Sequence, residues 1–193
     1  MRRIVATEFI SVDGVVEDPG GSEGTKHGGW SFKFQDPEGF KFKLQELKDH
    51  DAQLLGRVTY EGFAEAWPGR EDEMGFAEKM NAMPKYVVSS TLKDPTWNNS
   101  TVISFDDVAG LREQETGGDI IVHGSPSLVR GLLARGLLDE LRLWFHPLIL
   151  GRGEPGDLLF GAAPTTAWRL VDTTALSNGI VILAYEFDKR LDD

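Results

Sequence analysis

The sequence predicts an α/β fold built on a mixed sheet, with mostly parallel strands and an antiparallel C-terminal edge. Strand and helix patterns alternate through the first two-thirds of the chain, which is typical of parallel strands joined by crossover helices. The clearest case is the segment 119–133, in which a buried strand turns directly into a helix. The last third instead holds long β-rich runs around the turn Ser177-Asn178-Gly179, which indicates a hairpin.

The N-terminal part is expected to form a strand, a long loop and a helix. Residues 3–12 alternate in polarity and end at the turn dipeptide Asp13-Gly14. The glycine-rich residues 17–36 end in aromatic side chains, so they form either a disordered stretch or a flap that packs on the fold. A helix is predicted from Pro37 to His50 because its apolar residues follow helical spacing (Phe40, Leu44 and Leu47).

Further strands and helices are predicted in the middle of the chain. A strand at 52–56 leads at once into a helix that Pro68-Gly69 ends. A weaker helical stretch at 71–80 precedes the strand 85–89. A strand at 101–104 follows, and then a short helix to Gln114 that Asp106 or Asp107 can cap.

The segment 119–133 carries the strongest sign of a ligand site. After its strand, Gly124 permits a tight turn, and Ser125 and Pro126 fit the cap and first position of a helix. The first helical turn presents unpaired N–H groups at the positive end of the dipole, where the Ser125 and Ser127 hydroxyls can add donors for a phosphate. An ordinary capped turn without a ligand is the alternative.

Two other strand ends carry groups that suit phosphate. Gly56, Arg57 and Thr59 start a helix directly after a strand, and an arginine can clamp a phosphate with two hydrogen bonds. The hydroxyl cluster Ser89-Ser90-Thr91 follows another strand. A surface arginine and turn-forming hydroxyls are the alternatives. Because ligands of open α/β sheets bind beyond the carboxyl ends of the strands, the three junctions together favour one extended, multiply phosphorylated ligand such as a dinucleotide.

Composition narrows the class of protein. The 193 residues fit one domain, spanning 1–193. The lack of cysteine excludes disulfides, thiolate metal sites and cysteine nucleophiles. A formal net charge of −11 disfavours nucleic acid or an anionic membrane as a partner. We expect a cytoplasmic protein, because no apolar run has the length of a signal or membrane-spanning segment.

Several motifs are rejected on their context. The four histidines occur singly, without ligand spacing, so no metal site is expected. Residues 151–156 match G-x-G-x-x-G literally, but no helix follows them, and we interpret them as a connecting loop. No G-x-S-x-G motif supports a serine hydrolase.

Several segments together resemble the dihydrofolate-reductase-like superfamily, in the branch of the riboflavin-biosynthesis reductases (RibD C-terminal domains). They are Ser11-Val12-Asp13-Gly14, Leu55-Gly56-Arg57-Val58-Thr59-Tyr60-Glu61, Val88-Ser89-Ser90-Thr91-Leu92, His123-Gly124-Ser125-Pro126-Ser127-Leu128, Leu137-Leu138-Asp139-Glu140-Leu141-Arg142-Leu143 and His146-Pro147-Leu148-Ile149-Leu150-Gly151. The resemblance covers nearly the whole chain. It implies a three-layer α/β/α dihydrofolate-reductase-like fold and NADPH as the hydride donor.

The resemblance also implies roles for the junction residues. Gly56, Arg57 and Thr59 would hold cofactor phosphates, Ser89, Ser90 and Thr91 would lie by the adenosine 2′-phosphate, and Gly124, Ser125, Ser127 and Leu128 would cradle the pyrophosphate. His123, where the family often has an acidic residue, would sit where cofactor and substrate meet. On the substrate side, Asp13 is the candidate catalytic residue, joined by Gly14, Trp30, Glu38 and Trp67. A turn-forming Asp-Gly and core aromatic residues are the alternatives.

The implied function is that of an NADPH-dependent oxidoreductase resembling 5-amino-6-(5-phosphoribosylamino)uracil reductase, with hydride transfer to a C=N or C=O bond of a small molecule. A noncatalytic NADP(H)-binding or sensor protein and a dihydrofolate or pterin reductase are the alternatives. The chain lacks the signature of a zinc deaminase partner, so it would carry out reduction alone. A homodimer is expected, because strands such as 140–150 could pack across a two-fold interface, as in relatives.

Overall fold

The computed structural model describes residues 1–151, 156–161 and 163–188. In this part of the chain, an eight-stranded sheet has the order β4-β3-β2-β5-β1-β6-β8-β7. The strands are β1 (Ile4–Ser11), β2 (His50–Gly56), β3 (Lys85–Val88), β4 (Ser100–Ile103), β5 (Asp119–His123), β6 (Glu140–His146), β7 (Ala167–Ala175) and β8 (Val181–Asp188). The helices are η1 (Trp30–Phe34), α1 (Pro37–Lys48), α2 (Arg57–Ala66), α3 (Phe76–Ala82), α4 (Val108–Glu113) and α5 (Pro126–Ala134).

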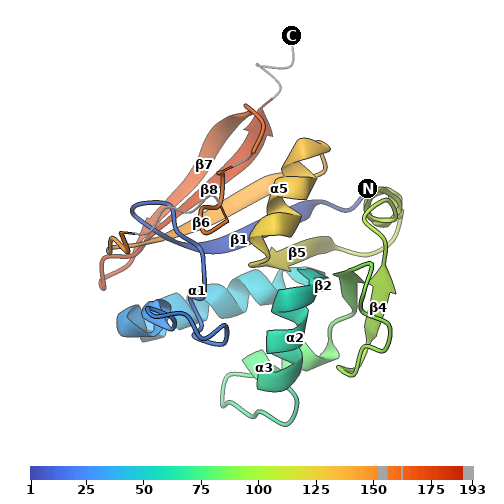
Figure 1. Ribbon diagram of the computed structural model, residues 1–193, viewed down its shortest axis with the longest axis horizontal. Helices are drawn as coiled ribbons and strands as arrows, with labels where there is room; N and C mark the ends of the chain where they lie inside the picture. The colour runs from blue at the N-terminus through green and yellow to red at the C-terminus, as the bar shows by residue number, and fades with distance from the viewer. Residues whose placement is uncertain (152–155, 162, 189–193) are drawn as a thin grey trace.

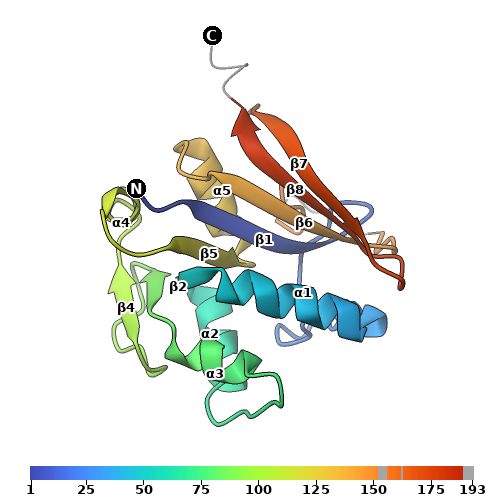
Figure 2. The ribbon, with the colours of Figure 1, turned by 180° about the vertical axis from the view of Figure 1, so that it is seen from behind.

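Helices cover both faces of the sheet. In Figures 1 and 2, α5 lies on one side of β1 and β5, and α1 lies on the other. The core under α4 and α5 contains buried residues such as Ile4, Ile120 and Leu132. The core under α1, α2 and α3 contains Leu47, Tyr60 and Met80. The central strands are therefore buried on both faces, which explains their nearly continuous apolar sequence.

The pairing of the strands confirms the predicted mixed sheet. Strands β4, β3, β2, β5, β1 and β6 pair in parallel, whereas β6 with β8 and β8 with β7 pair antiparallel. The hairpin turn forms where it was predicted, because Gly179 adopts a left-handed φ of 90° and Leu176 N–H donates to Ile180 O at 2.8 Å. The three-layer α/β/α fold with an antiparallel C-terminal edge follows from these observations.

Two helix starts differ from the prediction. Helix α3 begins at Phe76 rather than near residue 71, because the Asp72 carboxylate accepts the N–H groups of Phe76 and Met74 at 3.0 Å and ties the preceding residues into a turn. Asp107 occupies the predicted cap position of α4, but its side chain makes no cap hydrogen bond. The Asp107 carboxylate instead accepts the backbone N–H and hydroxyl of Ser104, so α4 starts without a side-chain cap.

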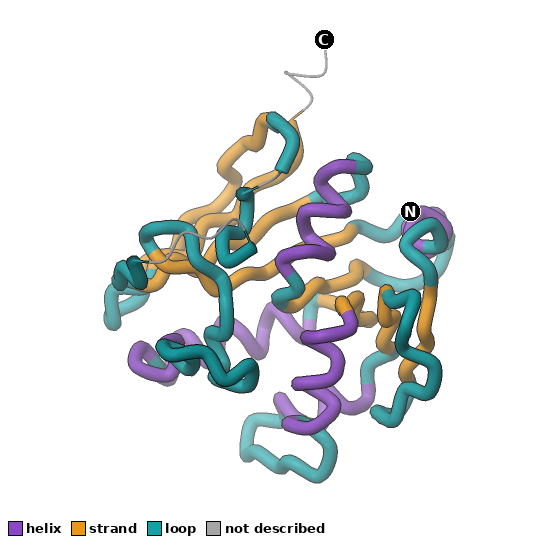
Figure 3. The backbone as a smooth tube through the Cα atoms, viewed as in Figure 1, coloured by secondary structure: helices purple, strands orange, loops and turns teal. Residues whose placement is uncertain are grey.

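The loop at residues 17–29 forms a packed flap rather than a disordered stretch. The buried Asp18 carboxylate accepts the N–H groups of Glu23 and Thr25, both at 3.0 Å. Trp30, which is 1% exposed, donates its indole N–H to Glu17 O at 2.9 Å and anchors the end of the loop. Figure 3 shows the backbone of this loop on the same side of the sheet as α2. Ser22 of the loop approaches that helix, since a Cβ atom added to Gly62 would lie 3.4 Å from Ser22 Oγ.

No helix in the described residues combines the length and apolar character needed to cross a lipid bilayer.

Candidate functional site

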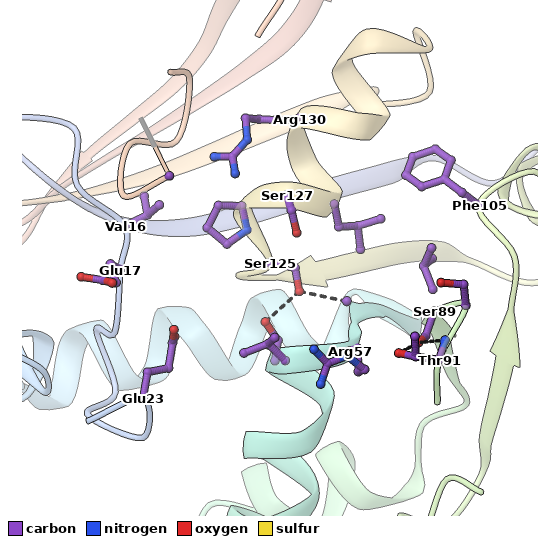
Figure 4. A pocket seen from close by; sticks show the side chains of 18 of the residues that line it. Val16, Glu17, Glu23, Arg57, Ser89, Thr91, Phe105, Ser125, Ser127 and Arg130 are labelled. Carbon is purple, nitrogen blue, oxygen red and sulfur yellow. Dashed lines mark hydrogen bonds between the residues drawn. The ribbon is translucent and has the colours of Figure 1, made fainter. Parts of the chain in front are cut away.

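A cleft of about 670 Å³ lies at the carboxyl ends of β2, β3 and β5, between the first turns of α2 and α5 (Figure 4). Its lining divides into two regions. The hydroxyl-rich end is lined by Gly56, Arg57, Val58, Thr59, Val88, Ser89, Ser90, Thr91, Ser104, Phe105, Ser125, Pro126, Ser127 and Leu128. The acidic end is lined by Val16, Glu17, Glu23, Arg130, Gly156 and Asp157. All three predicted junctions therefore contribute to one cleft.

The first turns of α2 and α5 face this cleft from opposite sides. Gly56 stands at the cap position of α2, and Ser125 stands at that of α5. The first N–H groups of each helix have no partner within the helix and carry the positive end of its dipole. Two such turns on one cleft create a region that favours anions.

The Ser125 hydroxyl has a different role from the predicted one. Ser125 occupies the predicted cap position of α5, but its hydroxyl makes no hydrogen bond to the N–H groups of that helix. Instead, it accepts the Gly56 N–H at 2.9 Å and donates to Thr59 Oγ1 at 2.7 Å. Because a hydroxyl has a single proton, this bond leaves Ser125 without a donor for a phosphate.

The third junction adds hydroxyls at the far side of α2. Ser89 Oγ accepts the N–H groups of Thr91 at 3.1 Å and Leu92 at 2.9 Å, which shapes the turn after β3. Ser90 and Thr91 are exposed. The Arg57 guanidinium pairs with Glu61 at 2.7 Å, and both side chains are more than 40% exposed. Such an exposed pair is weak, so a phosphate can replace Glu61 as the partner of Arg57.

The acidic end has the opposite electrostatic character. Figure 4 shows Glu17, Glu23 and Arg130 around it. Burial raises the pKa of Glu23, and the neighbouring charges of Asp18 and Glu17 raise it further. Arg130 Nη1 donates to Leu158 O at 2.9 Å, which holds the guanidinium against the loop that follows β6.

Asp13 and Gly14 do not line the cleft. The Asp13 carboxylate accepts Ser11 Oγ at 2.6 Å, Leu150 N–H at 3.2 Å and Gly151 N–H at 2.8 Å. Burial acts to raise the pKa of Asp13, but the hydrogen bonds from Ser11, Gly151 and Leu150 outweigh it and hold the pKa below its usual value. In this structure the Asp13 carboxylate ties the loop after β6 to the end of β1, and its role toward a substrate stays a prediction.

The aromatic and acidic residues expected on the substrate side also lie outside the cleft lining. Trp30 is a core residue whose ring packs edge-on against His146, with centroids 5.0 Å apart. Trp67 packs on Phe76 and under the Arg70 guanidinium. Glu38 is exposed in the first turn of α1.

His123 ends β5, and Gly124 begins the turn into α5. His123 is 6% exposed, and its ring centroid lies 6.3 Å from that of Phe63, on the side of α2. Burial, with the charges of Lys43 and His50, lowers the pKa of His123 well below its usual value, so the ring is neutral. Gly124 has a left-handed φ of 62°, which the tight turn into α5 requires. Neither residue is part of the cleft lining.

The sequence interpretation missed Glu8, a buried carboxyl group near the carboxyl end of β1. Glu8 is 2% exposed, and its Oε1 has no hydrogen-bond partner among the described residues. Burial raises the pKa of Glu8 to about 8, although the charges of Lys43 and Arg130 act to lower it. The alternation of β1 contained a signal, because Glu8 falls on the same face as the apolar Ile4, Ala6 and Ile10.

The sequence and fold comparisons agree with this architecture. The family model described as RibD C-terminal domain matches residues 2–182. The chain belongs to the RibD C-terminal domain family. The cleft therefore belongs to a protein of a reductase-like family.

Individual relatives match most of the length of this chain. The uncharacterized protein YyaP of Bacillus subtilis strain 168 is 27% identical, over 97% of this chain and 96% of its own. A Shewanella protein whose name links it to riboflavin biosynthesis has a similar fold, with a TM-score of 0.69 at 17% identity, over 97% of this chain and 99% of its own. A pyrimidine reductase-like protein from Corynebacterium diphtheriae has a TM-score of 0.62 at 16% identity, over 97% and 92% of the two chains.

Proposed function

We propose that this protein is an NADPH-dependent reductase that transfers a hydride to a C=N or C=O bond of a small heterocyclic substrate. The observation that supports this most strongly is the convergence of two helix N-termini on one elongated cleft. Unpaired N–H groups at the positive end of a helix dipole favour phosphate. A cleft with two such turns suits the diphosphate of a dinucleotide, and membership in a reductase-like family supports the same choice.

The residues of the hydroxyl-rich end fit this cofactor. Thr59 would hold one phosphate of the diphosphate at the start of α2, beside Gly56. Ser127 and Leu128 would hold the next phosphate at the start of α5, after the tight turn at Gly124. Any side chain at Gly56 would crowd Ser125, because its Cβ would lie 3.0 Å from Ser125 Oγ, so the absence of a side chain keeps the cleft open at this point. Ser89, Ser90 and Thr91 would lie by the 2′-phosphate, with Arg57 close to it.

The acidic end is the place for the substrate. NADPH supplies the hydride when bound, and the protein orients the acceptor and excludes water. Val16 and the flap residues Glu17 and Glu23 form one wall of this end. Glu23 and Asp157 would repel a phosphate placed beside them. We therefore expect an acceptor that turns an uncharged or cationic part toward these carboxylates.

Calorimetric titration with NADPH and NADH tests the proposal, followed by a turnover assay with pyrimidine, pterin and aldehyde acceptors. We expect NADPH to bind more tightly than NADH, and the absorbance of its reduced nicotinamide to fall when a suitable acceptor is present. No binding of NADPH at millimolar concentration would refute the function. Binding without oxidation of NADPH by any acceptor would favour a noncatalytic nucleotide-binding protein.

We also propose that the protein acts in the cytoplasm as a homodimer. The apolar side chains of Leu170 and Val171 on the edge strand β7 are 48% and 41% exposed, which supports a contact between two copies there. Sedimentation velocity of the wild type and of a Leu170→Lys variant tests this. A monomeric wild-type protein at micromolar concentration would contradict it.

A further inference from the structure

Ser125 connects the two helices that enclose the cleft. Its hydroxyl accepts the N–H of Gly56, the cap residue of α2, and donates to Thr59 in the first turn of the same helix. Ser125 itself is the cap residue of α5. Figure 4 shows the two bonds as dashed lines between these helix starts. One side chain therefore joins both N-termini, across 69 positions of the sequence.

The backbone at Ser125 is unfavourable for a serine. Its φ of 65° and ψ of 64° lie in the left-handed region, where a Cβ atom is disfavoured and glycine is the usual residue. Glycine would fit the turn itself better. The hydroxyl group therefore explains why serine occupies this position. The residue is buried, with only 5% of its surface exposed.

The two bonds determine how the helix starts lie relative to each other. Without the Ser125 hydroxyl, the Gly56 N–H and the Thr59 hydroxyl would lose their common partner, and α2 and α5 would no longer be joined at their first turns. A ligand that contacts a single helix would be little affected by this loss. A ligand that contacts both helices depends on their separation.

We propose that Ser125 is a positioning residue that holds the N-termini of α2 and α5 at the separation required to bind one diphosphate between them. This inference rests on the proposed function, because the diphosphate belongs to NADPH. Ser125 acts through the two helix starts and not by contact with the phosphates.

The Ser125→Gly variant separates positioning from a general role in folding. Glycine relieves the left-handed strain, which offsets the loss of the two hydrogen bonds of Ser125, so we expect the melting temperature to stay close to that of the wild type. We expect NADPH affinity to fall about 10-fold, because the protein would have to hold the two helix starts at the binding separation without the hydrogen bonds of Ser125. Affinity for adenosine 2′,5′-bisphosphate, which lacks the diphosphate bridge, should change less than about 2-fold. Isothermal calorimetry measures both affinities.

Asn99→Gly provides a matched control. Asn99 also has a left-handed backbone, with a φ of 58°, and its side chain donates to Ala82 O at 2.9 Å. It lies outside the cleft lining, so this variant should bind NADPH as the wild type does. Thr59→Val removes one end of the bridge together with the phosphate contact proposed for Thr59, so Ser125→Gly should lower NADPH affinity less in the Thr59→Val background than in the wild type.

Wild-type affinity for NADPH in Ser125→Gly would overturn this inference alone. An equal loss of affinity for NADPH and for adenosine 2′,5′-bisphosphate would also overturn it, because the residue would then act on one helix only. A wild-type protein that binds no NADPH would instead refute the proposed function, and the inference with it.

Discussion

Replacing Glu8 with glutamine is expected to change how the stability of the protein depends on pH. Glu8 is buried near the end of β1, and Oε1 has no hydrogen-bond partner among the described residues. Its pKa in the folded protein is about 8, compared with an ordinary value of 4.5, because burial disfavours the charged carboxylate. Lys43 and Arg130 are the cations that oppose this rise.

The sign of the effect follows from proton linkage. Between the two pKa values, the folded protein keeps a proton on Glu8 that the unfolded chain releases. The stabilisation linked to this proton is therefore complete at low pH and is lost as the pH rises toward 8. Because one pKa unit corresponds to about 1.4 kcal/mol, this group should lower the free energy of unfolding by about 2 to 3 kcal/mol between pH values of about 5.5 and 7.5.

Urea denaturation at several pH values in this range measures the effect. Glu8→Gln has no proton to lose, so its stability relative to the wild type should rise with pH by the same amount. Glu38→Gln, at an exposed position in α1, controls for the removal of one carboxylate. A constant difference between wild type and Glu8→Gln across the range would refute the reasoning, since Glu8 would then titrate alike in the folded and unfolded chains.

Three further predictions follow from specific contacts. Arg57→Ala should weaken the binding of NADPH more than that of NADH in calorimetric titrations, whereas an equal loss would place Arg57 at the shared diphosphate. Lys85→Met should lower the free energy of unfolding by about 2 to 4 kcal/mol in urea, because the buried ammonium donates to the carbonyls of Asn81, Met83 and Asn98; an unchanged midpoint would contradict this. Gly131→Ala should cost about 1 to 3 kcal/mol, because its Cβ would lie 2.6 Å from the Phe105 ring. Gly110→Ala, which has open space around it, is the matched control and should not destabilise the protein.

Local pattern was sufficient to predict most of the fold. The alternation of β1, the apolar run of β5 and the turn at 177–179 are short-range signals, and the structure has strands and a hairpin at these places. The same holds for the three junctions, because a glycine or hydroxyl cluster directly after a strand must lie at the end of that strand. Parallel pairing then brings those ends to one cleft.

The roles of several side chains depend on contacts with segments far away in the sequence, and local pattern could not predict these roles. Asp13 was expected to face a ligand, but its carboxylate binds Leu150 and Gly151, whose position beside β1 depends on the whole sheet. Ser125 occupies the predicted cap position of α5, but its hydroxyl bonds to Gly56, at the end of another strand. The burial of Trp30 likewise depends on the packing of the flap against His146. Each of these side chains was recognised as important, and each has a role set by a distant segment.

A crystal structure of the protein with NADPH would test the central claim most directly. We expect the diphosphate to lie between the first turns of α2 and α5, with the adenosine 2′-phosphate near Ser89, Ser90 and Thr91 and the nicotinamide toward the acidic end of the cleft. A cofactor bound elsewhere, or in the cleft with its diphosphate away from both helix starts, would contradict the account.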